Sequence, residues 1–193
     1  NAERTSDELW LLLRQLLETR DLDLRTDVLG VAVSSGVPSI TFELRRMCER
    51  YLDIEPVVLG TGIKTGMPVL YENPREVGAD RIANAVGAYD LFGGPTIVVD
   101  FGTATTFDVI SAKGEYMGGA IVPVIEISMD ALFGRAAALR RVELVAPRSV
   151  IGRTTVESIQ SGAVFGYSSL VDGMCERIED VIGDSTIVAT GGM

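Results

Sequence analysis

The chain of 193 residues contains no histidine and only two cysteines, Cys48 and Cys175. Without histidine, Ser-His and Cys-His catalysis and histidine-ligated zinc are excluded within this chain. The two cysteines lie far apart and match no metal-binding or redox spacing, which favours a protein of the reducing cytoplasm. Catalysis here must therefore use carboxylates, lysine, arginine, hydroxyl groups or a bound ion.

Basic residues are also scarce, with 17 Lys and Arg against 27 Asp and Glu and a formal net charge of -10. This balance argues against broad binding to nucleic acid or to an anionic membrane, although a few local donors can still hold a small anion. Every apolar run is shorter than the roughly 20 residues that a membrane span needs, and no signal peptide is evident. A hydrophobic content of 47% predicts a globular protein, and a length of 193 residues is enough for one core or two small lobes.

The most informative stretch is TIVVDFGTATTFDV, residues 96–109. An apolar strand leads to the carboxylate of Asp100, which is followed by a tight turn and a threonine-rich second strand. We interpret the turn as a phosphate-binding loop, because Gly102 lets the backbone approach a ligand closely and Asp100 is placed to hold a cation. Further hydroxyl donors come from Thr103, Thr105 and Thr106. The alternative is an ordinary β-hairpin whose turn contains Asp and Gly.

A second candidate site lies where a helix is expected to begin, at Asp80 and Arg81. Asn73-Pro74 marks a turn before this point, and apolar residues then recur at helical spacing as far as Leu91. The free N–H groups and the macrodipole of a helix start favour anions. The alternative is that Asp80 only caps the helix and that Arg81 is solvated.

The remaining chain alternates between predicted helices and strands, without a repeat, a low-complexity tract or a linker. Helices are expected at residues 6–19, 40–51, 126–139 and 155–182, the first of them behind a capping box at Thr5 and Glu8. Strands are expected at residues 28–34, 56–59, 116–122 and 186–190. The two strands around Asp100 and the strand at 116–122 predict an antiparallel meander. Small residues from Ser158 to Gly166 predict close packing of the last helix against another element.

Several motifs occur together in this chain. They are Gly78-Ala79-Asp80-Arg81, Asp100-Phe101-Gly102-Thr103-Ala104-Thr105-Thr106, Lys113-Gly114-Glu115-Tyr116 with Gly118-Gly119, Arg141-Val142-Glu143-Leu144, the segment 152–162 and Ala189-Thr190-Gly191-Gly192. In this combination the sequence strongly resembles the type III pantothenate kinases, which belong to the acetate and sugar kinase/heat-shock chaperone/actin superfamily. The resemblance covers essentially the whole chain.

The resemblance implies ATP-dependent phosphorylation of pantothenate to 4′-phosphopantothenate, the first step of coenzyme A synthesis. Asp80 would be the general base that takes the proton from the pantothenate hydroxyl. The residues implied to contact pantothenate are Tyr71, Gly78, Ala79, Asp80, Arg81 and Thr155. Asp100 would bind a monovalent cation, K⁺ or NH₄⁺, and Mg²⁺ would accompany ATP. Thr103 would bind ATP within the second phosphate loop, together with Gly102 and Thr105, and Gly191 and Gly192 would begin the adenosine loop.

The chemistry of these residue types agrees with the implied roles. Phosphoryl transfer needs an aligned acceptor hydroxyl and charge stabilisation more than covalent help from the protein. A carboxylate such as that of Asp80 can orient and deprotonate a primary alcohol as it attacks. The adjacent Arg81 can bind the pantothenate carboxylate in a bidentate manner. A chain without histidine can therefore perform this reaction.

The implied fold is α/β, with two ribonuclease-H-like lobes of the actin-like ATPase superfamily, residues 1–92 and 93–193, and an active site in the cleft between them. The family also forms homodimers in which both protomers can complete the pantothenate pocket. The first phosphate loop of the family, of Asp-x-Gly-Asn-Thr type, has no match here. We therefore expect a fragment with an incomplete N-terminal lobe and without the segment that follows Gly192. The family usually has Pro-Gly where this chain has Pro123-Val124, and valine does not readily adopt a positive φ.

Two other functions stay open at this point. Some relatives are described as accessory factors in transcription, although an acidic chain without a basic stripe argues against direct DNA contact. A different kinase of the superfamily, such as one acting on a sugar, is the other alternative. The Gly78–Arg81 motif together with Tyr71 argues against a sugar kinase. The fragment itself is also expected to fold poorly or to be inactive if its first strands are missing.

Overall fold

The computed structural model describes residues 4–60, 63–136 and 139–192. The chain divides into two compact units, one formed by residues 1–66 and 72–84 and the other by residues 67–71 and 85–193. Helices and a mixed sheet together make an α/β protein, which confirms the α/β class expected from the sequence, without testing the two ribonuclease-H-like lobes.

In the first unit, helix α1 (Ser6–Glu18) begins with the predicted capping box. The Glu8 backbone N–H donates to Thr5 Oγ1 (3.3 Å), and the Thr5 backbone N–H donates to Glu8 Oε2 (2.8 Å). Trp10 on this helix is buried and stacks on Tyr51, with ring centroids 4.8 Å apart. Together with Leu24, Met47 and Cys48, Trp10 forms the core of this unit.

The predicted helix at 40–51 is found as α2 (Pro38–Met47), followed by a π-helical turn at Cys48–Leu52. Two short strands, β1 (Ala32–Val33) and β2 (Val57–Val58), pair in parallel. The prediction of a buried strand over 28–34 was wrong in extent, because Leu29 is 95% exposed and β2 offers only two residues for pairing. An apolar run becomes a long strand only where a neighbouring strand satisfies its backbone groups.

The second unit contains a four-stranded sheet with the order β5-β4-β3-β6. Its strands are β3 (Thr96–Phe101), β4 (Thr105–Ile110), β5 (Tyr116–Val122) and β6 (Thr186–Gly191). β3, β4 and β5 form the predicted antiparallel meander, and β6 pairs with β3 in parallel. The apolar run of β3 is buried from Thr96 to Val99, as its sequence indicates.

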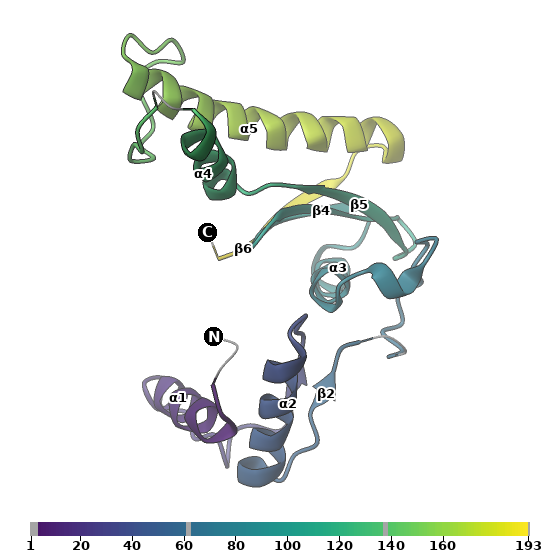
Figure 1. The fold of residues 1–193 in the computed structure, drawn as a ribbon. Coiled ribbons are helices and arrows are strands. Elements are labelled where there is room, and N and C mark those ends of the chain that lie inside the picture. The colour runs from purple at the N-terminus through teal and green to yellow at the C-terminus, as the bar shows by residue number, and fades with distance from the viewer. Residues whose placement is uncertain (1–3, 61–62, 137–138, 193) are drawn as a thin grey trace. The chain divides into compact units, whose positions relative to one another are not determined.

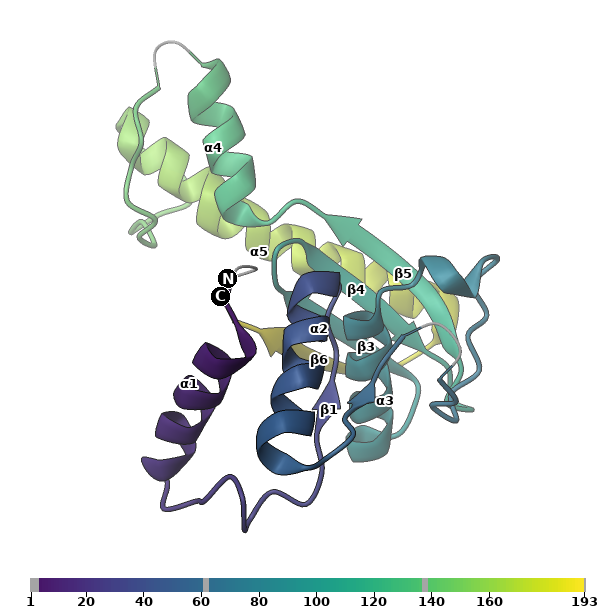
Figure 2. The same cartoon turned by 60° about the horizontal axis from the view of Figure 1, so that its bottom comes forward.

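Helix α5 (Thr155–Ile182) has the bounds that the sequence predicts. Its C-terminal half covers one face of the sheet, where Cys175 packs with Ile97, Val99 and Phe107 (Figure 1). Its N-terminal half extends past the sheet and lies beside α4 (Ile125–Arg135), as both views show (Figure 2). Helix α3 (Ala79–Phe92) begins in the first unit, and its residues 85–92 belong to the second.

Helix α4 differs from its prediction at both ends. The expected helix at 126–139 ends at Arg135, and the next residue, Ala136, is extended with φ -95° and ψ 101°. Residues 137 and 138 lie outside the described residues. Val124 is buried and caps the start of α4 with φ -66°. Because this φ is negative, valine fits the position without the strain that a left-handed backbone would impose.

Candidate active site

The candidate base Asp80 lies in the first turn of α3. Its carboxylate is exposed, and its Oδ1 accepts a hydrogen bond from the Arg81 backbone N–H (2.9 Å). Ala79 begins the helix, and the carbonyl of Gly78 accepts the first helical hydrogen bond, from Ile82 (3.2 Å). The structure therefore places the four residues of the motif around one helix N-terminus, where free N–H groups and the helix dipole attract anions.

Gly78 has a steric reason to be glycine. A Cβ atom at this position would lie under 3.0 Å from Asp80 Oδ1, a separation that real Cβ atoms essentially never show. The missing side chain leaves the Asp80 carboxylate its position beside the helix start. Arg81, the next residue, is largely buried, with 8% of its surface exposed. The expectation that Arg81 is merely a solvated surface residue therefore does not hold.

In the second unit, the candidate phosphate loop connects β3 to β4 and is a hairpin turn, as the simpler alternative expected. Asp100 is half-buried near the end of β3, and Thr103 at the tip is exposed. The Gly102 backbone N–H donates to the Ala104 carbonyl (3.2 Å) inside the turn. A hairpin turn of this kind can still bind phosphate, because its glycine and its exposed hydroxyl remain accessible to a ligand.

The hydroxyl groups of the other two threonines, Thr105 and Thr106, are hydrogen-bonded to other side chains of the second unit. Thr105 is fully buried, and its hydroxyl is hydrogen-bonded with that of Tyr167 on α5. Thr106 Oγ1 donates to Asp108 Oδ2 (3.0 Å). In this arrangement Thr105 and Thr106 support the hairpin from within, and Thr103 is the threonine whose side chain is exposed at the turn.

The two segments predicted to bind ATP lie side by side although they are far apart in sequence. β6 runs parallel to β3, so that Phe101 is paired with Gly191. The Gly192 backbone N–H donates to the Phe101 carbonyl (3.2 Å). Gly191 has φ +112°, and a Cβ atom there would lie under 3.0 Å from the Phe101 backbone. The glycine pair and the phosphate loop thus share the carboxyl ends of neighbouring parallel strands, where α/β proteins commonly bind ligands.

Tyr71, the remaining aromatic candidate, belongs to the second unit. It is half-buried and lies against β5, where a Cβ atom on Gly118 would be 3.5 Å from Tyr71 Cε2. A Cβ atom at this distance would make ordinary van der Waals contact with the ring, so the feature that favours glycine at residue 118 is its φ of +122°. Sequence reasoning did not detect this relationship, because Tyr71 and Gly118 are joined only through the fold.

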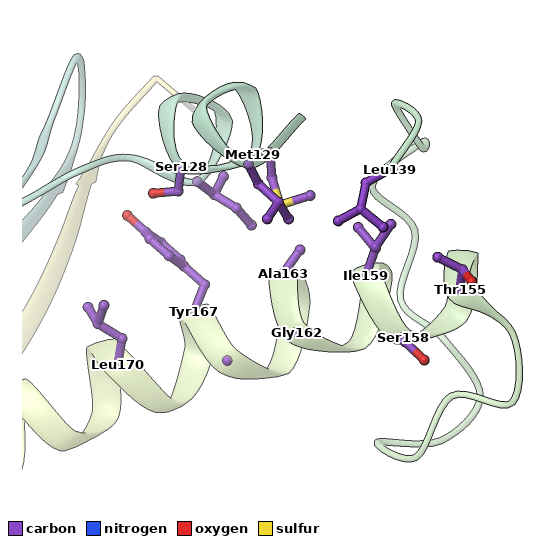
Figure 3. A pocket seen from close by; sticks show the side chains of 13 residues that line it. Ser128, Met129, Leu139, Thr155, Ser158, Ile159, Gly162, Ala163, Tyr167 and Leu170 are labelled. Atoms are coloured by element: carbon purple, nitrogen blue, oxygen red, sulfur yellow. The ribbon is translucent and has the colours of Figure 1, made fainter. Parts of the chain in front are cut away.

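Thr155 lies elsewhere in the second unit, at the exposed N-terminus of α5. Roughly 18 Å of helix separates it from Tyr167, the α5 residue that is hydrogen-bonded to Thr105 of the phosphate loop, at about 1.5 Å per residue. The structure therefore does not bring Thr155 to the phosphate loop of its own chain. Instead, Thr155 lines one end of a groove between α4 and α5 (Figure 3).

This groove has a volume of about 650 Å³. Tyr167 and Ala163 contribute to its α5 wall and Met129 to its α4 wall, as Figure 3 shows. Gly162 and Gly166 also line it, and neither would bring a Cβ atom within 4 Å of another part of the chain. The small residues of α5 therefore leave open space in the described structure, whereas the sequence predicted tight packing for most of this stripe.

Comparison with known proteins identifies the family. The sequence profile described as "Type III pantothenate kinase" matches residues 1–177. The chain belongs to the type III pantothenate kinase family. A type III pantothenate kinase of Anaeromyxobacter sp. (strain Fw109-5) is 56% identical over 98% of this chain and 75% of its own length. Those of Moorella thermoacetica and Myxococcus xanthus are 53% and 54% identical over 100% of this chain and 76% and 75% of theirs.

A solved structure shares the fold at lower similarity. It is a protein of Campylobacter jejuni assigned to the Baf family of transcriptional activators, with a TM-score of 0.52 and 18% identity over 82% of this chain and 68% of that chain. At this identity the likeness concerns the fold alone. The family resemblance noted from the motifs is confirmed by the profile and by the close relatives. Among the residues that the structure describes, no helix is long and apolar enough to cross a membrane.

Proposed function

We propose that this protein phosphorylates the hydroxyl group of pantothenate with ATP, giving 4′-phosphopantothenate in the first step of coenzyme A biosynthesis. The observation that carries this proposal is the Gly78–Arg81 motif at the N-terminus of α3, in a chain that matches type III pantothenate kinases over nearly its full length. Within the proposal, a carboxylate, a largely buried arginine and a helix dipole converge on a single substrate-binding position.

Asp80 acts as the general base in this proposal. Its exposed carboxylate accepts a proton from the pantothenate hydroxyl as the oxygen attacks the γ-phosphorus of ATP, and the phosphorus–oxygen bond to ADP breaks. Arg81 and the helix N-terminus bind the pantothenate carboxylate. Gly78 and Ala79 shape the same position through their backbone, and Tyr71 adds an aromatic surface.

The nucleotide is held at the carboxyl ends of β3 and β6. Thr103 binds the phosphates through its exposed hydroxyl, Gly102 lets them approach the turn closely, and Thr105 supports the hairpin from inside. Gly191 and Gly192 begin the adenosine loop, beside Phe101 as described above. Support comes from the hydrogen bond that joins Gly192 to Phe101, since it fixes the two segments relative to each other.

Asp100 is proposed to hold the cations. No group of three or more His, Cys, Asp or Glu side chains lies together in the described part of the chain, so a site at Asp100 has at most two such side chains from these residues. That donor set fits Mg²⁺, which commonly binds through one or two carboxylates, water and substrate phosphates. The negative charge of the same carboxylate can also attract K⁺ or NH₄⁺. A cation here offsets the negative charge of the phosphates.

We also propose the two ribonuclease-H-like lobes of the actin-like superfamily, residues 1–92 and 93–193, for the whole protein. We further propose that the protein is a homodimer of the cytoplasm. The exposed position of Thr155, roughly 18 Å along α5 from Tyr167, which is hydrogen-bonded to Thr105 of the sheet, supports a dimer in which Thr155 serves the pantothenate pocket of the partner. Light scattering that shows a monomer for the full-length protein would remove this part of the proposal.

A coupled ADP-release assay on the full-length gene product tests the activity. We expect turnover that needs both pantothenate and ATP and that rises with K⁺ or NH₄⁺. A panel of sugars and other small alcohols serves as the matched comparison, and we expect no turnover with them. A folded, ATP-binding protein that turns over a sugar but not pantothenate would reject the proposed substrate, and one that is inactive with the whole panel would reject the kinase function.

A further inference from the structure

A carboxylate that the proposed mechanism does not use lies buried in the sheet of the second unit. Asp108 on β4 has none of its surface exposed. Its Oδ1 accepts a hydrogen bond from the Tyr116 hydroxyl (2.7 Å), and its Oδ2 accepts one from Thr106 Oγ1 (3.0 Å). Because a buried carboxylate is costly unless hydrogen-bonded, these two donors explain how an aspartate persists in an otherwise apolar strand.

The register between β4 and β5 brings Tyr116 to Asp108. Val109 is paired with Gly118 and Ile110 with Tyr116, so Met117 is an extra residue in β5 and makes a bulge. Residues that lie opposite each other in antiparallel strands share a face, and so do residues two apart in one strand. The bulge therefore turns Tyr116 to the face that carries Ile110 and Asp108.

The backbone of Tyr116 holds the segment that carries Tyr71. The Tyr116 N–H donates to the Pro68 carbonyl (2.8 Å), and the Tyr116 carbonyl accepts from the Leu70 N–H (2.8 Å). Val69 forms an isolated parallel bridge with Tyr116 between these two bonds. Leu70, which is hydrogen-bonded to Tyr116, directly precedes Tyr71 in the chain. The backbone position of Tyr71 is therefore fixed beside Tyr116.

The Tyr71 ring packs on Tyr116 and beside Gly118. Its centroid lies 6.5 Å from that of Tyr116, with the two planes inclined at 48°, within the range of separations at which aromatic rings interact. Tyr71 also lies beside Gly118, and an added Cβ atom on Gly118 would be 3.5 Å from the tyrosine ring. The φ angle of Gly118 is +122°. Tyr116 is fully buried, so it provides a rigid surface for the more exposed Tyr71.

We propose that the hydrogen-bonded pair Asp108–Tyr116 positions the Tyr71 ring for the substrate, so that Asp108 and Tyr116 set the affinity for pantothenate without touching it. This inference rests on the proposed function, in which Tyr71 contacts pantothenate. The Asp108 carboxylate fixes the Tyr116 hydroxyl, the buried Tyr116 ring fixes Tyr71, and the proton transfer at Asp80 does not depend on this chain of contacts.

The test is a double-mutant cycle between Tyr116→Phe and Tyr71→Ala in the full-length protein. Tyr116→Phe keeps the ring and both backbone hydrogen bonds but removes the donor to Asp108. We expect it to raise KM for pantothenate about fivefold to tenfold, because a less well held Tyr71 ring would lose contact with the substrate worth about one hydrogen bond. We expect kcat to change less than about twofold and KM for ATP to stay constant, because the nucleotide loop is not part of the pair.

The cycle separates positioning from a general structural defect. If Tyr116 acts through Tyr71, Tyr116→Phe has no further effect on KM for pantothenate in a Tyr71→Ala background. Tyr89→Phe, a change of a tyrosine on α3, is the matched control and leaves KM unchanged. Circular dichroism and the KM for ATP show whether each variant is folded.

Either of two results would overturn the positioning role and leave the proposed function standing: an unchanged KM for pantothenate in Tyr116→Phe, or effects of the two substitutions on KM that simply multiply. A fall in kcat and a rise in both KM values would also reject it, since the pair would then support the whole fold. A wild-type protein without pantothenate-dependent turnover would reject the proposed function itself, and the positioning role with it.

Discussion

The carboxylate of Asp80 occupies the space that a side chain at residue 78 would need. A Cβ atom on residue 78 would come under 3.0 Å from Asp80 Oδ1, and the flexible end of a carboxylate is the atom that would have to move. Gly78 also accepts the first hydrogen bond of α3, from Ile82. The absence of a side chain at one residue thus determines where the proposed base lies.

The first prediction concerns Gly78→Ala. We expect the added methyl group to push the Asp80 carboxylate aside and to lower kcat on the order of a hundredfold, the cost typical of a misplacement of about 1 Å. The free energy of unfolding should change little, because the carboxylate is exposed and can rotate. Steady-state kinetics with pantothenate and urea denaturation measure the two effects.

Gly87→Ala on the same helix is the matched control, because a Cβ atom at residue 87 meets nothing within 4 Å. It should leave kcat unchanged and stabilise the protein by about 0.5–1 kcal/mol, as glycine is unfavourable inside a helix. Full activity in Gly78→Ala would contradict the steric argument for the position of Asp80.

The second prediction concerns Asp80→Asn, which removes the base and keeps the shape of the side chain. We expect kcat to fall by about 10²- to 10⁴-fold, the usual contribution of a general base. Binding of ATP, measured by calorimetry, should not change. Asp90→Asn, at the exposed C-terminal end of the same helix, should be fully active. A variant Asp80→Asn with wild-type kcat would remove Asp80 from the catalytic role.

Local patterns predicted most of the elements in this protein. The bounds of α5 and β5 agree with their predictions, because a long 3.6-residue periodicity and an alternating strand between turn residues are strong local signals. The meander followed from short turns between adjacent strands. The motif at Gly78 to Arg81 was also found from sequence, together with its place at a helix start.

Relationships between distant segments could not be predicted in the same way. The parallel pairing of β6 with β3, which brings Gly191 beside Phe101, depends on the whole fold. So does the contact of Tyr71 with Gly118. The pair Asp108–Tyr116 depends on a bulge of one residue, and a single carboxylate in an apolar strand was the only local signal for it. The prediction of a strand over 28–34 was too long for a related reason, because the length of β1 is set by its partner strand β2.

The third prediction concerns the pH dependence of stability. Burial raises the pKa of the Cys48 and Cys175 thiols, with further contributions from Glu49 near Cys48 and from Glu179 near Cys175. The folded protein therefore keeps these protons at a pH where the unfolded chain, with a thiol pKa of about 8.5, releases them. The free energy of unfolding should be constant with respect to these groups below that pH and fall as pH rises above it.

Urea denaturation between about pH 7 and 9.5, around the ordinary thiol pKa, measures this slope. A double variant, Cys48→Ala with Cys175→Ala, should be less stable throughout because it loses buried volume, but its stability should decline less over the same range. Both wild-type thiols should also react slowly with a thiol-specific reagent until the protein is unfolded, because both are buried. Rapid labelling of the folded protein would contradict their burial.

The last prediction tests the proposed dimer through the groove between α4 and α5. Gly162 lines this groove, is exposed, and has nothing within 4 Å of the position of an added Cβ atom. Gly162→Arg should therefore fold normally within its own chain, while a long charged side chain would prevent close approach of a partner along the small residues of α5. We expect light scattering to show a monomer and KM for pantothenate to rise, because Thr155 of one protomer would no longer reach the pocket of the other.

The matched control is Ser169→Arg, at an exposed position on the same helix outside the groove lining, which should stay dimeric and active. If Gly162→Arg stays dimeric with unchanged kinetics, the groove is not the contact between protomers, and the role of Thr155 in pantothenate binding would have to be abandoned as well.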